Sequence, residues 1–258
     1  MIVFFAGLIV ILAGGIAALL LRRFYTLSAT VGATTVIAGS MLGLYSALNV
    51  LIKAVPVGFH AAWHVPMGSF ATEIDSLTAF FLCAILGLSI ISALYGWEYL
   101  RPSAAEPARG RCSWQWFNLL VVAMALVVVA RNAVLFLMAW EMMAIASFFL
   151  VAFDSERDQV RQAAWTYLVA THLGSALLLV MFVMIGNHTG SLDYAAWGNL
   201  KTAGQGFLNV LFVLGLIGFG VKAGMYPLHV WLPEAHPAAP SHVSALMSGV
   251  MIKTGIYA

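Results

Sequence analysis

Residues 218–240 read GFGVKAGMYPLHVWLPEAHPAAP, and this stretch decides how the chain can fold. It begins as an apolar segment that contains one charged residue, Lys222. It then holds four of the chain's eight prolines: Pro227, Pro233, Pro237 and Pro240. Proline lacks a backbone N–H group and breaks an α-helix. We therefore predict an apolar helix that contains Lys222 and is broken directly after it.

The composition of the chain is that of a membrane protein. Of its 258 residues, 62% are hydrophobic and only 9% are charged, whereas soluble domains have about 25% charged residues. The net charge of +2 gives no indication of nucleic-acid binding. Cys83 and Cys112 are too few for a disulfide framework or a metal cluster. We therefore expect no cofactor and no metal in this chain.

Eight segments are apolar and long enough to be membrane helices, since about 20 residues cross a bilayer core. They are residues 2–21, 26–52, 75–97, 115–130, 133–153, 163–186, 207–226 and 241–258. The predicted fold is thus an all-α membrane protein, a polytopic bundle of about eight transmembrane helices with the seventh helix broken. Because the last segment is still apolar at Ala258, we expect a chain that is cut inside a helix.

The basic residues predict the orientation of the bundle, because cytoplasmic loops are rich in Lys and Arg. With the N-terminus outside, seven basic residues lie in inside loops, namely Arg22, Arg23, Arg101, Arg109, Arg111, Arg157 and Arg161. Only Lys53, Arg131 and Lys201 lie in outside loops. We therefore predict an outside N-terminus. Since the first basic residues follow the first apolar segment, that segment is expected to be a retained span rather than a cleaved signal.

The two long outside loops are predicted to have structure of their own. Residues 53–74 contain Pro56, Gly58, Pro66 and Gly68 and are expected to form an extended segment or a hairpin. Residues 187–206 contain Asp193, Tyr194, Trp197 and Leu200, which suit a short helix along the membrane interface. We expect both loops to serve packing and topology.

Three ionisable residues lie within predicted spans, where a charge costs about 2.5–3.5 kcal/mol on insertion scales. Glu141 lies in span 133–153, Lys222 in span 207–226 and Lys253 in the last span. Burial favours the neutral form of a lysine, and a nearby carboxylate favours the charged form. A Glu141–Lys222 pair can therefore be switched by a change in its separation. The alternatives are a static ion pair and a protonated glutamic acid that is hydrogen-bonded across helices.

Histidines near these residues are suited to carry protons, since the imidazole titrates near neutral pH. His172 is central in span 163–186 and is predicted to pass protons between Lys222 and its neighbours. Interrupted helices in transporters mark ion pathways. Four polar residues lie within or just after the broken segment, and we expect them to cluster at a hydrated kink toward the cytoplasm: His229, Glu234, His236 and His242. Hydrogen bonding and helix capping are the alternatives, with haem ligation a further one for His172.

Residues 135–150 (LFLMAWEMMAIASFFL) and residues 218–257 resemble the antiporter-like proton-channel subunits of respiratory complex I, Mrp antiporters and membrane-bound nickel–iron hydrogenases. The similarity covers about residues 70–258 and is strongest to the hydrogenase-4 and formate hydrogenlyase branch. Residues 1–114 are expected to form the N-terminal helices 1–3 with an outside hairpin loop. Residues 115–258 would be the proton-antiporter-like transmembrane domain, within the first of the family's two inverted repeats.

The resemblance implies a relay of Glu141, Lys222 and Lys253 in a proton half-channel, with His242 near the start of the last span. The implied function is that of a proton-translocating subunit in the bacterial inner membrane. Its partners would be the lipid bilayer, other membrane subunits of an oxidoreductase and the peripheral redox arm. An Mrp-type cation/proton antiporter subunit and a non-conducting membrane scaffold are the alternatives.

Overall fold

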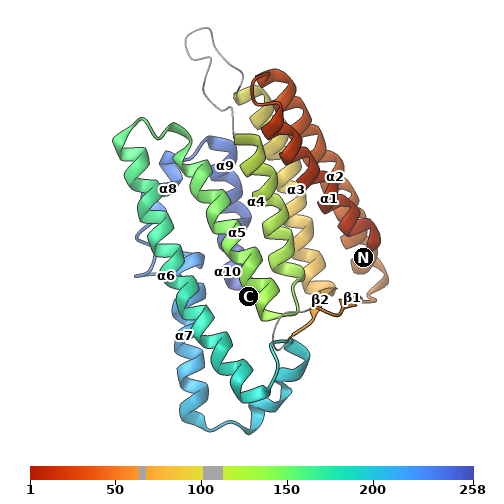
Figure 1. Ribbon diagram of the computed structural model, residues 1–258, viewed down its shortest axis with the longest axis vertical. Helices are drawn as coiled ribbons and strands as arrows, with labels where there is room; N and C mark the ends of the chain where they lie inside the picture. The colour runs from red at the N-terminus through yellow and green to blue at the C-terminus, as the bar shows by residue number, and fades with distance from the viewer. Residues whose placement is uncertain (64–67, 101–112) are drawn as a thin grey trace.

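The protein was analysed as a computed structural model that describes residues 1–63, 68–100 and 113–258. Pro66, Cys112 and the loop residues Arg101, Arg109 and Arg111 lie outside the described residues. The described chain is a bundle of helices with one small β-hairpin (Figure 1). In that view α1 to α3 lie on one side of the bundle and α6 to α8 on the other, with α4, α5 and α9 between them.

Six helices in the described part of the chain are long and apolar enough to cross a membrane. They are α1 (Ile2–Leu20), α2 (Tyr25–Lys53), α3 (Ser76–Tyr99), α5 (Ala133–Val151, extended by η1, Ala152–Asp154), α6 (Asp158–Thr189) and α7 (Gln205–Ala223). α4 (Ser113–Val129) is shorter but apolar. The last span consists of α9 (Ser241–Leu246), the π-helical turn η3 (Met247–Met251) and α10 (Ile252–Tyr257). The predicted all-α membrane bundle is therefore confirmed.

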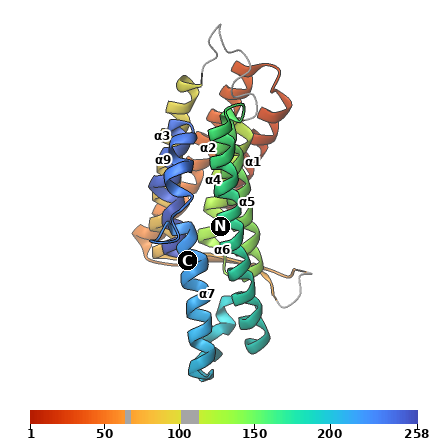
Figure 2. The ribbon, with the colours of Figure 1, turned by 90° about the vertical axis from the view of Figure 1, so that its left-hand side faces the viewer.

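Both long loops that were predicted to be structured lie at one end of the bundle, which we call the hairpin end. The first contains the antiparallel strands β1 (Val57–Ala61) and β2 (Phe70–Ile74). The second contains the 3₁₀ helix η2 (Tyr194–Thr202). Figures 1 and 2 show that α6 and α7 extend beyond the hairpin at this end.

α7 ends at Ala223 because the backbone of the next residue cannot continue a helix. Gly224 has a φ of 65°, which favours glycine and closes helices at their C-terminal end. The indole N–H of Trp231 donates a 2.8 Å hydrogen bond to the carbonyl of Val221, one of the last carbonyls of the helix. A carbonyl group at the break is thus hydrogen-bonded inside the protein, as backbone at membrane depth requires. The chain then forms α8 (Leu232–Ala238).

The contact between α6 and α7 depends on two glycines that let the backbones approach closely. A Cβ atom on Gly174 would lie 3.0 Å from the carbonyl oxygen of Gly218 and 3.2 Å from the Cβ atom of Val221. A Cβ atom on Gly218 would lie only 2.6 Å from Leu178. Small residues at such contacts are the usual basis of helix packing in membranes. This contact holds Lys222, on α7, against α6.

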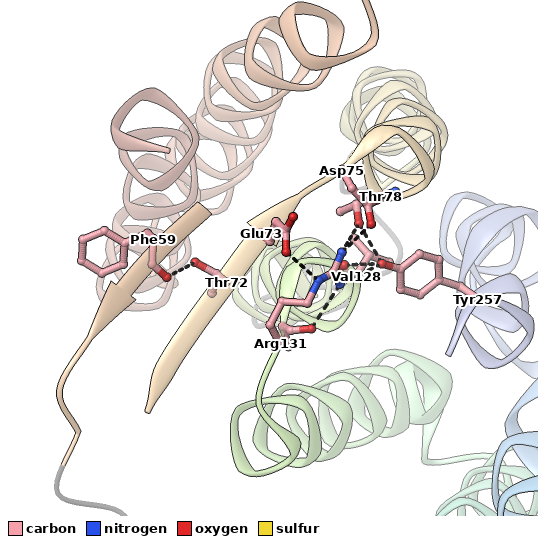
Figure 3. Close-up of polar contacts among 9 residues, drawn as sticks. Phe59, Thr72, Glu73, Asp75, Thr78, Val128, Arg131 and Tyr257 are labelled. Atoms are coloured by element: carbon pink, nitrogen blue, oxygen red, sulfur yellow. Dashed lines mark hydrogen bonds and ion pairs between the residues drawn. The ribbon is translucent and has the colours of Figure 1, made fainter. Parts of the chain in front are cut away.

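Arg131, in the turn between α4 and α5, joins several elements at the hairpin end (Figure 3). Its guanidinium group donates to Asp75 Oδ2 at 2.8 Å and to Thr78 Oγ1 at 3.0 Å, and its Nε atom lies 3.5 Å from Glu73. Its backbone N–H bonds to the carbonyl of Ala71 in β2. Arg131 therefore fixes the hairpin and the start of α3 to the turn before α5.

The side chain of Tyr257, the last residue of α10, belongs to the same network (Figure 3). Its hydroxyl donates to the carbonyl of Val128 at 2.6 Å, near the C-terminal end of α4. With that hydrogen committed, Thr78 donates to the tyrosine oxygen at 2.8 Å and accepts from Arg131. This directional chain of hydrogen bonds fixes the end of the last helix relative to α3 and α4.

Asp75 forms an ion pair with Arg131. It also caps α3, since it accepts a 2.7 Å hydrogen bond from the N–H of Thr78. Partial burial on its own raises the pKa of this carboxyl. The hydrogen bonds from Thr78 and the positive charge of Arg131 outweigh burial, and the pKa of Asp75 lies below its ordinary value. The ionised form is therefore the one that stabilises the fold.

We expect Gly218→Val to destabilise the bundle by about 1–3 kcal/mol, because the added side chain overlaps Leu178 and pushes α6 from α7. The measurement is the unfolding temperature of the detergent-solubilised protein. Gly87→Val is the matched control, since a Cβ atom at Gly87 in α3 has no neighbour within 4 Å. Equal unfolding temperatures for the two variants would contradict the close contact.

The stabilising contribution of Asp75 is expected to be present near neutral pH and lost as pH falls. A carboxyl with a lowered folded-state pKa starts to lose its contribution below the unfolded value of about 3.9. The unfolding temperatures of the parent protein and of Asp75→Asn should therefore differ at pH 7 and converge toward pH 3. A difference that does not change with pH would show that the charge of Asp75 has no part in stability.

Candidate functional site

Lys222 is the one charged side chain that is fully buried among the described residues, with an exposed fraction of 1%. It lies in the last turn of α7, and its Nζ atom donates a 2.8 Å hydrogen bond to the hydroxyl of Tyr167. The same atom lies 5.2 Å from the ring centroid of Tyr167 and 5.8 Å from that of Trp140. An ammonium group has three donors, and the described residues supply one hydrogen-bond acceptor. The site therefore suits a lysine that can give up its proton.

Tyr167 is a candidate functional residue that was not predicted from the sequence. It is fully buried, and it shares the inner face of α6 with Thr171, Gly174 and Leu178. The 3.6-residue period of the helix gives this face, and it turns the neighbouring His172 about 100° away from Thr171. The helical period was thus the one signal that could have selected Tyr167, the partner of Lys222.

Glu141 and His172 lie in contact at the surface of the described chain. Glu141 Oε2 is 3.2 Å from His172 Nε2, and the two side chains are 33% and 46% exposed. The other ring nitrogen of His172 lies 3.0 Å from the carbonyl oxygen of Leu168. A carbonyl can only accept, so that nitrogen, Nδ1, carries a hydrogen. The Glu141–His172 contact then requires one proton between Oε2 and Nε2, on either partner.

No ion pair joins Glu141 to Lys222 in the described part of the chain. Glu141 contacts His172, whereas Lys222 contacts Tyr167 and the ring of Trp140. Trp140 directly precedes Glu141 on α5. Lys222 therefore lies near the residue next to Glu141. The predicted Glu–Lys contact is replaced in this structure by two separate hydrogen-bonded pairs, Glu141–His172 and Lys222–Tyr167.

Lys253 lies just after the π-helical turn, and its Nζ atom donates to the carbonyl of Ser248 within that turn. Gly255 lets α10 pack on α7, since a Cβ atom there would lie 2.9 Å from the backbone of Phe219. The hydroxyl of Tyr167 lies 3.9 Å from the sulfur of Met251, the last residue of the turn. Tyr167 therefore stands between Lys222 and the segment that carries Lys253, whose own side chain is exposed on the described chain.

The broken segment lies beside a polar cleft of about 390 Å³ between the start of α6 and α8. Charged and amide side chains in its lining are Arg157, Gln159, Gln162 and Glu234. His236 Nδ1 lies 3.1 Å from the hydroxyl of Ser244. His229 packs against the ring of Tyr226, and its Nδ1 atom has no hydrogen-bond partner within the described residues.

His242 is enclosed by α3 and α4. Its ring lies 5.5 Å from that of Phe117, and a Cβ atom on Gly96 would lie 2.8 Å from it. It is 2% exposed, and Nδ1 has no hydrogen-bond partner among the described residues. The contacts of Lys222 are instead to α5 and α6, so the structure does not bring His242 into contact with Lys222.

The residues described by the structure hold no group of three or more His, Cys, Asp or Glu side chains that could bind a metal ion. The ionisable side chains of the candidate site are arranged in pairs. Lys222–Tyr167 is the buried pair, Glu141–His172 is the partly exposed pair, and Lys253 lies beyond Tyr167 on the last span.

The sequence is similar to those of known membrane proteins. The sequence family described as NADH:quinone oxidoreductase/Mrp antiporter, TM, matches residues 130–258. Hydrogenase-4 component B of Escherichia coli K12 is 36% identical over 97% of this chain and 37% of its own length. NADH-quinone oxidoreductase subunit L of Mycobacterium tuberculosis is 31% identical over 73% of this chain and 29% of its own length. The chain thus spans about a third of the length of these relatives.

Two solved structures share the fold. A subunit of the archaeal membrane-bound sulfane sulfur reductase aligns with a TM-score of 0.81 and 24% identity over 97% of this chain and 39% of that chain. A chain of the Mrp complex from Dietzia sp. DQ12-45-1b aligns with a TM-score of 0.81 and 23% identity over 98% of this chain and 27% of that chain. Since the family match covers residues 130–258, which include every predicted relay residue, the chain belongs to the NADH:quinone oxidoreductase/Mrp antiporter transmembrane family.

Proposed function

We propose that this chain forms a proton half-channel in a membrane subunit of a hydrogenase-4-type or complex I-like oxidoreductase, in the bacterial inner membrane. The observation that carries the proposal is the fully buried Lys222, which lies at the end of a broken helix and has Tyr167 as its hydrogen-bond acceptor. A buried ionisable residue in a membrane span is costly and marks ion pathways or proton relays. The similarity to hydrogenase-4 component B over 97% of the chain supports this branch of the family.

The proposed route begins at the polar cleft beside α8. Glu234, in the broken segment, lines this cleft together with Arg157 and Gln162. His229 and His236 are the proposed carriers between the cleft and Lys222. The positive-inside pattern of the loops supports an orientation with the cleft on the cytoplasmic side and the N-terminus outside. In this orientation Lys222 takes up protons from the cytoplasm.

The second part of the proposed route leads from Lys222 toward the last span. Tyr167 accepts a hydrogen bond from Lys222 and lies against the π-helical turn. A phenol both donates and accepts, so Tyr167 can take a proton from Lys222 while its own proton leaves toward the segment of Lys253. The thioether of Met251 cannot be protonated, so a water molecule is the proposed acceptor of that proton. His242, on the same span, is the proposed carrier on the side of α3 and α4.

Glu141 and His172 are proposed to control the charge beside this route. Their contact holds one proton, and gain or loss of that proton changes the net charge of the pair by one unit. A more negative pair favours protonated Lys222, and a more positive pair favours the neutral amine. Redox chemistry in partner subunits, including the peripheral arm, would drive the change. Transfer of one proton against 100 mV requires about 2.3 kcal/mol.

An Mrp-type cation/proton antiporter subunit is the second candidate, because the fold of the Dietzia Mrp chain matches 98% of this chain. The two functions differ in what drives transport. Uptake that follows electron transfer supports the oxidoreductase, whereas uptake that follows a sodium gradient without electron transfer supports the antiporter. A membrane scaffold predicts neither response.

Replacement of Lys222 by methionine keeps the length of the side chain but removes its proton. We expect redox-driven proton uptake in native membrane vesicles to fall by about 100-fold or more, the usual loss when a proton-transfer group is removed, while the complex stays assembled. Lys201→Met is the matched control, because Lys201 is an exposed lysine in η2. Normal uptake in assembled Lys222→Met complexes would overturn the channel assignment.

The contact between Glu141 and His172 predicts that both residues are needed for proton uptake. In His172→Gln the ring nitrogen that faces Glu141 is lost, so the rate of redox-driven proton uptake should fall. Glu141→Gln should abolish uptake, because the pair can then no longer become negative. His188→Gln, near the end of the same helix, is the control. An unchanged rate of uptake in His172→Gln would exclude a role for the pair in proton control.

A further inference from the structure

A cavity of about 430 Å³ lies at the hairpin end, beside Ala258, the last residue of the sequence. Polar side chains of its lining are Asp75, Arg131, Tyr194 and Tyr257, and Figure 3 shows three of these in the network around Arg131. Aromatic rings of its lining include Phe136, Phe182 and Phe219. The cavity thus has a charged side and an aromatic side.

Four aromatic residues, Phe136, Trp140, Phe182 and Phe219, form a continuous cluster that we call the aromatic seal. The ring of Phe136 lies 5.2 Å from Trp140, 5.8 Å from Phe182 and 6.1 Å from Phe219. The rings of Trp140 and Phe219 are 5.8 Å apart. Three helices, α5, α6 and α7, therefore each contribute to one apolar layer.

The aromatic seal lies between the cavity and Lys222. Phe136 and Phe219 line the cavity, and Trp140, which touches both, lies 5.8 Å from Lys222 Nζ. The order along the helices agrees, because Phe136 is four residues nearer the hairpin end than Trp140 on α5. Phe219 is likewise three residues nearer that end than Lys222 on α7. Along α5 and α7, these rings therefore lie between the cavity and Lys222.

We infer that the aromatic seal is a barrier that prevents protons from returning to Lys222 from the hairpin end. This inference rests on the proposed role of Lys222 as a proton carrier. Protons move along hydrogen-bonded water, and an apolar constriction excludes water. The charge of Arg131 at the cavity is paired with Asp75 and Glu73, so the apolar layer itself forms the barrier. The cavity therefore ends at a dry layer instead of continuing to the lysine.

The test is the passive proton leak of vesicles that carry the complete protein in its assembled complex, without electron donor or sodium gradient. A pH jump that acidifies the hairpin side is followed with a pH-sensitive dye inside. Phe219→Ala should leak about tenfold faster than the parent, equivalent to about 1.4 kcal/mol of barrier. Phe219→Leu, which keeps the layer apolar, should leak less than the alanine variant. Phe212→Ala is the matched control, since Phe212 is 68% exposed on the same helix.

A double variant separates a lost barrier from a damaged fold. In Phe219→Ala/Lys222→Met the leak should return toward the parent rate, because the proton has lost its carrier. A leak that persists without Lys222, or no leak in Phe219→Ala, would overturn the seal. These results are distinct from failure of the proposed function, which would appear as normal redox-driven uptake in Lys222→Met alone.

Discussion

The hydrogen bond between Lys222 and Tyr167 is the interaction on which the arrangement of the helices depends. A lysine at full burial needs an acceptor, and the acceptor lies on α6, which packs on α7 through Gly174 and Gly218. The break after Ala223 is required as well, because it ends α7 directly after this lysine and lets Trp231 satisfy the freed carbonyl. The glycines, the tryptophan and the prolines thus all support one charged group inside the bundle.

Much of the fold could be predicted because the membrane imposes length and polarity on every span. Hydropathy predicted the helices, and glycine and proline predicted the hairpin and the break in the seventh helix. The predicted span of residues 163–186 was too short, because α6 extends from Asp158 to Thr189. Its first turn contains Asp158 and Arg161, and charged residues at a helix end carry no hydropathy signal. The division near residue 114 and the outside N-terminus stay predictions.

The site was less predictable, because the pairing of side chains across helices depends on the rotation of each helix. Position in the sequence correctly selected Lys222 as an ionisable residue inside a span, but not Tyr167, the residue that receives its hydrogen bond. His172 was expected beside Lys222, and one helical step instead turns it to Glu141. His242 was expected with the other histidines of the broken region, yet its ring is enclosed by α3 and α4. Only the packed helices determine these partners.

The π-helical turn at Met247–Met251 also has a rotational consequence. Compared with an α-helix, a π turn holds one extra residue, and each residue advances an α-helix by about 100°. Lys253 follows the turn and therefore lies on a different side of the helix than it would on a regular α-helix. Conversion of this turn to an α-helix would swing the lysine around the helix axis without moving the axis itself. The π turn thus determines on which side of the last span Lys253 lies.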